Sequence, residues 1–137
     1  MAAQAITVQS IVAAPLEKVW RAYTTPDDIK QWNAASEDWH TPSATVDLRE
    51  GGVFSSRMEA RDGSMGFDFA GTYTKIETHR LIEYDFGDRH ARVEFTPGEG
   101  GVRITVTFDA ESEHPIDVQR DGWQSILDNF KRYVEGS

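Results

Sequence analysis

The residues with the clearest chemical capability lie in one irregular stretch of the chain, positions 32–45. Positions 37–40 read Glu-Asp-Trp-His, and an acid close to a histidine is a common arrangement for transferring protons to a substrate. A tyrosine hydroxyl is another such group, and Tyr84 lies further along the chain. Asp38, His40 and Tyr84 are therefore the candidate catalytic residues. The alternative is that positions 37–40 belong to a solvated loop with no chemical role.

Metal and cofactor chemistry has weaker support in the sequence. Glu37, Asp38 and His40 would form only a weak metal-binding set, because no second cluster at ligand spacing accompanies them. The chain contains no cysteine, which excludes disulfides, thiolate metal sites and cysteine nucleophiles. It also lacks a Ser-His-Asp order, a glycine-rich phosphate loop and a His-x-x-x-His pair. We therefore expect no metal and no cofactor, and we favour a protein that is not an enzyme.

Composition and charge limit the classes of partner. The chain has 137 residues, and we expect residues 1–137 to form a single domain. A hydrophobic share of 39% is sufficient for a core. The formal net charge of -9 argues against nucleic acid or an anionic membrane as partner, since both attract a basic surface. The chain shows neither a signal peptide nor an apolar run long enough to span a bilayer, so we expect a cytoplasmic protein.

Two short helices are predicted after a first strand at positions 6–12. Pro15 suits the start of a helix, and the apolar residues that follow it recur at the spacing of one helical face: Leu16, Val19, Trp20 and Tyr23. Positions 25–28, Thr-Pro-Asp-Asp, form a variant of the capping box, which restarts a short helix through Ile29. Positions 32–45 then lose all periodicity and are predicted to form a long connection that could serve as a lid.

The middle of the chain is predicted to form an antiparallel meander. Stretches rich in β-branched and aromatic residues alternate with short turns, most of which contain glycine, and such turns join antiparallel neighbours. The strands are expected at positions 53–60, 65–76, 81–86, 89–95 and 102–108. The last strand alternates strictly, and its apolar face consists of Val102, Ile104, Val106 and Phe108. One face of the sheet is therefore expected to be covered and the other to face solvent.

The end of the chain is predicted to be one long amphipathic helix that begins near Ile116. Its buried stripe is expected to consist of Gln119, Trp123, Ile126, Leu127, Phe130 and Val134. The only partner for this stripe is the preceding sheet, so the sequence predicts an α+β fold in which a curved antiparallel sheet wraps around the helix, with a hollow between them. Gly122 costs ~1 kcal/mol in a helix relative to alanine, and we expect it to mark a tight crossing rather than an opening.

Bulky residues on the covered face are the candidate ligand-binding residues. They are Phe54, Met58, Phe67, Phe69, Tyr84, Phe86, Gln119 and Trp123, together with Trp32 and Trp39 from the irregular stretch. Aromatic residues at such spacing more often fill a core, so the alternative is a solid interior in which Phe67, Phe69 and Trp123 meet directly. Gln119 differs from the others because a buried polar group needs a partner, which could be a backbone group, a water or a ligand.

Three segments carry a resemblance that covers nearly the whole chain: VAAPLEKVWRAYTTPDDIKQW, GGVFSSRMEARDGSMGFDFAGTYTKIE and RDGWQSILDNFKRYVE. In this order they resemble the bacterial family related to the activator of the ninety-kilodalton heat-shock protein ATPase (AHSA-like), within the START-like or SRPBCC superfamily. The resemblance implies a helix-grip fold and a hydrophobic cavity that holds a small apolar or amphipathic molecule. The family commonly shows two consecutive tryptophans where this chain has Trp32 and Asn33, so we expect a different cavity mouth.

Three functions from different classes remain open. The favoured one is non-catalytic binding of a small apolar or amphipathic ligand in the cavity. The second is an enzyme of the cyclase, dehydratase or hydrolase kind that acts on a cavity-bound substrate. The third is an interaction module linked to a chaperone and the stress response, although we do not expect 137 residues to supply the further domain with which the eukaryotic co-chaperone engages its partner. An exposed edge strand could pair two copies, so the chain is expected to be a monomer or a homodimer.

Overall fold

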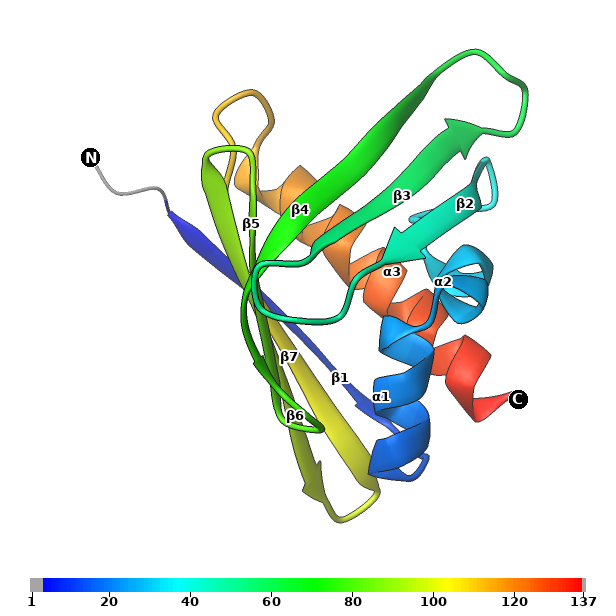
Figure 1. The fold of residues 1–137 in the computed structure, drawn as a ribbon. Helices are drawn as coiled ribbons and strands as arrows, with labels where there is room; N and C mark the ends of the chain where they lie inside the picture. The colour runs from blue at the N-terminus through cyan, green and yellow to red at the C-terminus, as the bar shows by residue number, and fades with distance from the viewer. Residues whose placement is uncertain (1–3, 137) are drawn as a thin grey trace.

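The computed structural model describes residues 4–136, which form seven strands and three helices (Figure 1). In chain order the elements are β1 (Ala5–Val12), α1 (Leu16–Thr24), α2 (Pro26–Trp32), β2 (Trp39–Val46), β3 (Val53–Ala60), β4 (Gly66–Glu77), β5 (Leu81–Phe86), β6 (Arg89–Gly98), β7 (Gly101–Asp109) and α3 (Ile116–Glu135). Within this part of the chain, no helix is both long and apolar enough to span a membrane.

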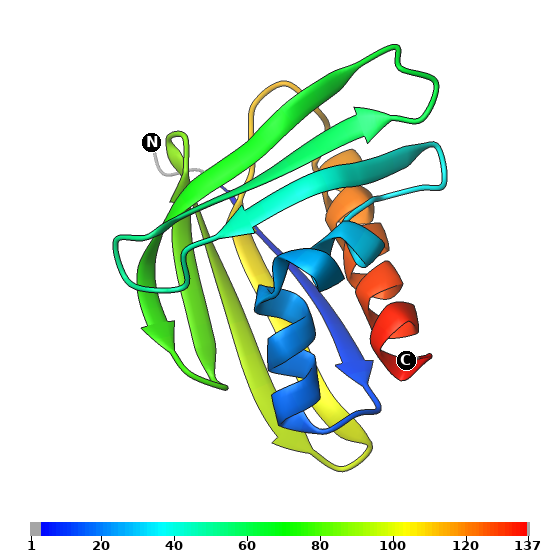
Figure 2. The same ribbon diagram turned by 45° about the vertical axis from the view of Figure 1, so that its right-hand side comes forward.

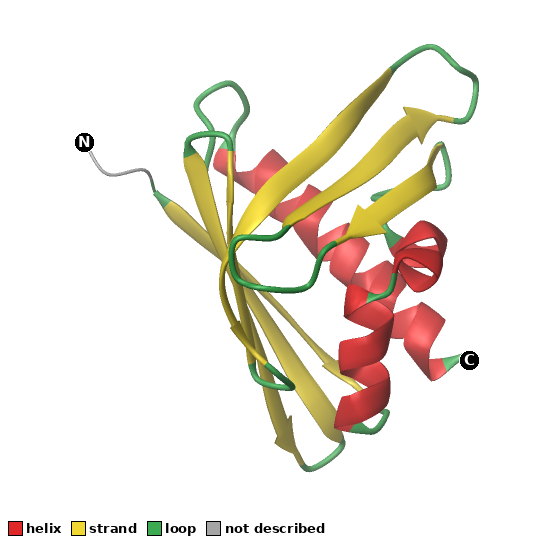
Figure 3. Cartoon of the chain, in the orientation of Figure 1, coloured by secondary structure: helices red, strands yellow, loops and turns green. Residues whose placement is uncertain are grey.

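The strands form one curled antiparallel sheet in the order β1-β7-β6-β5-β4-β3-β2. All three helices lie on its concave side, and the sheet bends around α3 (Figure 3). Figure 2 shows α1 and α2 next to α3, with α2 also beside β2. The predicted α+β helix-grip architecture, with two short helices after the first strand, is confirmed.

The alternation in the sequence sets which face of each strand is buried. In β7 the predicted apolar face is buried and the intervening residues are at least partly exposed. In β1, Val8 and Val12 are buried, whereas the equally apolar Ile11 points outward and is 44% exposed. The stripe on α3 completes the core, since Leu127, Phe130 and Val134 are buried against this face. Period-two and helical patterns therefore predicted the core of β7 and α3 correctly. Phe67, which was expected on the covered face, is instead 49% exposed near the start of β4.

The free edge of the sheet at β1 is closed by side chains of α3. Gln124 Nε2 donates to the carbonyl oxygen of Gln9 at 3.0 Å, and Lys131 Nζ donates to that of Ile11 at 2.6 Å. An edge strand exposes a row of unpaired backbone groups that can pair with another chain. The side chains of α3 therefore occupy two of the backbone acceptors on this edge.

The junction between α1 and α2 differs in detail from the prediction. Thr25 is the N-cap of α2 and Pro26 its first residue, but the Thr25 side chain makes no capping hydrogen bond. Asp28, the expected acidic partner in the capping box, instead accepts a hydrogen bond from the hydroxyl of Tyr133 on α3. The helix also continues to Trp32 rather than ending at Ile29. The tertiary contact with α3 therefore replaces the local capping bond.

Strand β2 was missed, because positions 32–45 were predicted to be a long connection. The structure places Trp39–Val46 in a strand at the edge of the sheet, paired with β3. A register shift between His40 and Ser43 breaks the period-two pattern, and Pro42 lies within the shift. Proline is tolerated on edge strands and at bulges, so both features hide a strand from a periodicity argument. Only the residues from Asn33 to Asp38 remain as a connection.

A substitution at Phe130 tests the assignment of the α3 stripe to the core. Its ring is fully buried and lies 5.2 Å from the ring of Tyr23 and 4.9 Å from that of Trp32. We expect Phe130→Ala to lower the free energy of unfolding by about 3–5 kcal/mol, because it leaves a cavity in the core. Ile11→Ala on the outer face is the control and should cost less than about 1 kcal/mol in urea unfolding. Equal losses for the two variants would contradict the assigned core.

Candidate functional site

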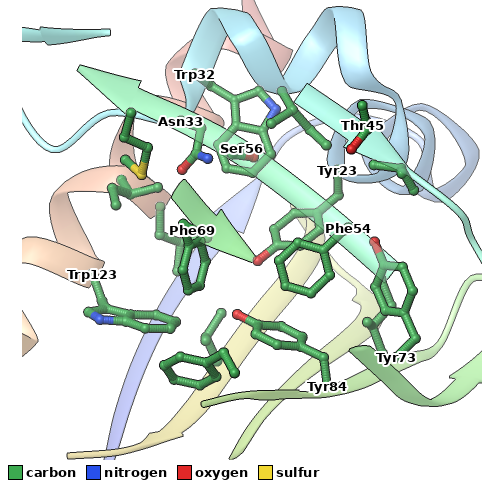
Figure 4. A pocket seen from close by; sticks show the side chains of 18 of the residues that line it. Tyr23, Trp32, Asn33, Thr45, Phe54, Ser56, Phe69, Tyr73, Tyr84 and Trp123 are labelled. Carbon is green, nitrogen blue, oxygen red and sulfur yellow. The ribbon is translucent and has the colours of Figure 1, made fainter. Parts of the chain in front are cut away.

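A pocket of about 430 Å³ lies between α3 and the inner face of strands β3 to β5 (Figure 4). Helices α1 and α2 supply part of its wall through residues that include Tyr23 and Trp32, and strands β2, β6 and β7 contribute further lining residues. Most of the residues predicted to bind a ligand line it: Trp32, Phe54, Met58, Phe67, Phe69, Tyr84, Phe86 and Trp123. The sheet and α3 thus bring together side chains that are far apart in sequence.

The pocket exists because α3 approaches only one side of the sheet closely. Its close backbone approaches are to β1, α1 and α2, and the Trp123 ring stacks on Phe108 of β7 at 3.8 Å. On β4, the ring of Phe69 meets that of Trp123 edge to face at 6.2 Å. Two of the rings expected to meet in a solid core therefore do meet, and the pocket lies beside them. Phe67 contacts Trp39 instead, at 5.9 Å.

Gly71 on β4 sets the position of one pocket wall. A Cβ atom at this residue would lie 2.8 Å from the ring of Phe54 and 2.6 Å from the carbonyl oxygen of Asp85. The absence of a side chain lets the Phe54 ring lie directly over the strand, where it also contacts Tyr84 edge to face at 4.9 Å. Any larger residue at position 71 would clash with this ring and with the Asp85 carbonyl group.

Three tyrosines line the pocket. Tyr73 and Tyr84 are each 7% exposed, and Tyr23 lies opposite them on α1. Within residues 4–136, none of these hydroxyls forms a hydrogen bond with another residue, and no fully enclosed polar side-chain atom lacks a partner. The three oxygens are therefore not fully enclosed by protein atoms. Figure 4 shows those of Tyr23 and Tyr84 directed towards its centre.

The environment keeps these phenols protonated. Burial raises the pKa of Tyr73 to about 12, and the nearby carboxylate of Asp47 contributes to the increase. Burial also raises the pKa of Tyr84 and of Tyr23. The positive charge of Arg89 opposes the shift at Tyr84 without cancelling it. At neutral pH the three groups are uncharged donors and acceptors of hydrogen bonds, and they are poor general bases.

A second, outer pocket continues the first towards solvent between the β3–β4 end of the sheet and the first half of α3. The two share Met58, Phe67, Arg89, Glu111, Trp123 and Ile126. Trp39 and Gln119, which were also predicted to bind a ligand, line this outer part. The Gln119 amide, however, bonds the loop before α3: it accepts from the Glu111 N–H at 2.9 Å and donates to the His114 carbonyl at 2.8 Å. Its partner is thus the backbone.

Gly122 faces open space, so the tight crossing expected there is wrong. A Cβ atom built on Gly122 would meet no atom within 4 Å, and the residue lines the outer pocket. The sequence argument failed because a helical glycine marks either close approach or free volume, and spacing alone does not distinguish the two. Here the missing side chain widens the entrance beside α3.

The candidate catalytic residues do not lie together. Tyr84 lines the pocket, whereas Asp38 and His40 belong to neither part of it. Asp38 is exposed, and its carbonyl oxygen accepts from the Arg61 N–H at 2.8 Å. His40 is half-buried on β2 opposite Glu59. The geometry therefore provides no shared proton-transfer site for these three residues.

Glu37, Asp38 and His40, which the sequence offered only as a weak metal set, do not form a group of closely spaced ligand atoms in the described part of the chain. A different group of ligand types lies near the outer pocket. Glu111, Glu113 and His114 place carboxylate and imidazole atoms within 4.8 Å of one another. Two of the three are exposed, and Glu111 accepts from the backbone N–H of His114 at 2.7 Å. Surface acids in a loop adopt this arrangement for local hydrogen bonding, so we assign no metal to it.

Sequence reasoning missed several pocket residues. Ser56 lies in the period-two phase between two predicted lining residues, and Tyr73 shares the inward phase of Phe69, so both could have been found from strand alternation. Tyr23 was placed on the correct helical face without being assigned to the pocket. Arg89 shares the inward phase of Ala91 and Val93 on β6, so its place on the covered face could also have been found. Its contacts with the Phe86 ring of β5 and the Asp109 carbonyl group of β7 could not, because they join residues that no local pattern relates.

The curled sheet around a long C-terminal helix defines a START-like, helix-grip protein. The family described as Activator of Hsp90 ATPase homolog 1-like protein matches residues 13–135, so the chain belongs to this family. None of the curated proteins matches it significantly.

Solved structures of proteins from several bacteria share the whole fold. The AHSA1-like protein from Aeromonas hydrophila is 46% identical, with a TM-score of 0.91 over 97% of this chain and 93% of that one. A protein from Cytophaga hutchinsonii is 45% identical, with a TM-score of 0.83 over 96% and 92% of the two chains. A protein from Chromobacterium violaceum, at 23% identity and a TM-score of 0.83 over 96% and 98%, is similar in fold alone.

The space beside Gly122 gives a stability prediction with a matched control. We expect Gly122→Ala to raise the free energy of unfolding by about 0.5–1 kcal/mol, because alanine restricts the unfolded chain and meets nothing in the folded one. Gly71→Ala should instead destabilise, because its Cβ atom would meet the Phe54 ring and the Asp85 carbonyl. Urea unfolding of both variants decides the matter. A destabilising Gly122→Ala would show that the helix does pass close to another element.

The pocket phenols predict a loss of stability in alkali. Tyrosines in the unfolded chain ionise near pH 10, whereas Tyr73 and Tyr84 keep their protons to higher pH when folded. Their contribution to stability is complete below pH of about 10 and is lost as pH rises through the folded pKa values. The Tyr73→Phe and Tyr84→Phe double variant should show a shallower decline in free energy of unfolding above that pH. An unchanged slope would mean that these hydroxyls titrate normally.

Proposed function

We propose that this protein is a non-catalytic cytoplasmic carrier or sensor that binds a small, largely apolar molecule in the pocket between α3 and strands β3 to β5. The observation that carries the proposal is the combination of aromatic walls with buried hydroxyl groups that have no protein partner in the described chain. Ligand pockets commonly pair an apolar lining with a few convergent polar groups.

The volume of the pocket is consistent with a ligand of about one to three rings, or with an alkyl chain of similar volume. A volume of about 430 Å³ lies within the ~300–1,000 Å³ range of small-molecule pockets. Apolar burial would drive binding, at roughly 25 cal/mol for each Å² removed from water. The hydroxyls of Tyr23, Tyr73 and Tyr84 would accept or donate hydrogen bonds to a polar atom of the ligand, which favours an amphipathic molecule over a pure hydrocarbon.

The arrangement favours binding over chemistry. A general base must hold its proton loosely near the working pH, and the raised pKa of Tyr84 does the opposite. Asp38 and His40, the other groups considered for proton transfer, lie outside the pocket. We therefore infer that the ligand leaves the pocket unchanged.

A neutral fluorescent probe tests this proposal without knowledge of the natural ligand. N-phenyl-1-naphthylamine fluoresces on entering apolar sites, and we expect saturable binding to the wild-type protein. Ile126→Trp should weaken that binding by about tenfold or more, since Ile126 lines both parts of the pocket and the larger ring would occupy its volume.

The matched control is Arg120→Trp, which adds the same side chain at an exposed position of α3. It should leave probe binding unchanged. Native mass spectrometry of the purified protein would add the mass of any retained ligand. An unsaturable signal, or equal binding to the two tryptophan variants, would contradict the pocket as the binding site.

A further inference from the structure

Arg89, at the start of β6, is a cation built into the wall of the pocket. It lines both the inner and the outer parts, and it is the only lysine or arginine that does so among the described residues. Its guanidinium lies 4.5 Å from the centroid of the Phe86 ring. Nε donates to the carbonyl oxygen of Asp109 at 3.0 Å, which fixes the side chain in place. The residue therefore sits where the two parts of the pocket join.

The remaining N–H groups of Arg89 have no protein acceptor. Across residues 4–136, no carboxylate lies within 4.0 Å of its nitrogens, and the bond from Nε is its only hydrogen bond from the side chain. An arginine side chain carries five N–H donors in a rigid planar fork that matches a carboxylate. One edge of this fork is therefore available from the pocket.

The surroundings favour binding of an anion at this fork. Guanidinium is weakly hydrated, and here one of its faces lies against an aromatic ring, which reduces the water that a ligand must displace. Hydrogen bonds between charged groups are roughly twice as strong as neutral ones. Beyond Arg89 the inner pocket continues with Phe69, Phe86 and Trp123, which offer no charge.

We propose that the ligand is an amphipathic acid whose carboxylate binds Arg89 while its apolar body fills the inner pocket. This inference rests on the proposed binding function and assigns the chemical class of the ligand. A fatty acid and an aromatic acid share this chemistry, and the experiment below separates them.

Glu111 limits the charge that the site accepts. It lines both parts of the pocket, and interactions with His114 and Arg89 lower its pKa, so it is ionised at neutral pH. Its Oε1 already accepts the N–H of His114 at 2.7 Å. A ligand anion on Arg89 therefore also experiences repulsion from Glu111, which favours a single negative charge over a phosphate or a dicarboxylate.

The experiment compares acids with their neutral amides at pH 7. The probes are 2-naphthoic acid with 2-naphthamide, and dodecanoic acid with dodecanamide, each titrated by displacement of N-phenyl-1-naphthylamine. Arg89→Gln should weaken binding of the preferred acid by about tenfold or more, with little change for its amide. Arg92→Gln is the matched control, because Arg92 lies on the same strand but on the outer face. Glu111→Gln should tighten binding of the acid by about two- to fivefold.

The outcomes separate this inference from the proposed function. If the acids displace the probe no better than the amides, or if Arg89→Gln weakens both equally, the assignment of the carboxylate to Arg89 is wrong while the pocket stands. If the neutral probe itself fails to bind, the proposed function is wrong as well. If Arg89→Gln weakens binding of naphthoic acid alone, the ligand class is aromatic acids. If it weakens binding of dodecanoic acid alone, the class is alkyl acids. Thermal unfolding of Arg89→Gln confirms that the variant is folded.

Discussion

The position of α3 along the edge strand β1 is the constraint on which the rest of the structure depends. Hydrogen bonds from Gln124 and Lys131 to carbonyl groups of β1 attach the helix to one border of the sheet. The buried stripe of α3 then packs on β1, β7 and the two short helices. A single helix placed in this way cannot also cover the inner face of β3, β4 and β5. The sheet curls towards it, and large aromatic side chains span the remaining distance.

This geometry explains why the pocket is aromatic and why it contains hydroxyl groups. Rings such as Phe69 and Trp123 can bridge between strand and helix by edge-to-face contact, whereas aliphatic side chains would be too short. Tyrosine supplies the same bulk with a polar end, and that end costs free energy when it is buried without a partner. The pocket therefore contains hydrogen-bonding groups that only a ligand or solvent can satisfy. Arg89 adds one positive charge where the inner and outer parts join.

Much of the architecture followed from local patterns in the sequence. Strict alternation in β7 and the helical stripe containing Phe130 report burial directly, because each depends only on the period of its own element. Strand β2 was missed because the register shift beside Pro42 breaks its period-two alternation. The pocket was predictable only in part. Phe69 carried a signal in its strand phase, but the environment of Arg89 arises from contacts between residues far apart in sequence, which no local pattern encodes.

Intermolecular nuclear Overhauser effects from bound N-phenyl-1-naphthylamine to assigned side chains would test the central claim most directly. The account predicts contacts from the probe to Phe69, Tyr84 and Trp123, which come from three different elements and meet only inside the pocket. Contacts confined to exposed apolar residues such as Met65 and Val118 would contradict it, and would show that the apolar surface of this protein binds from outside.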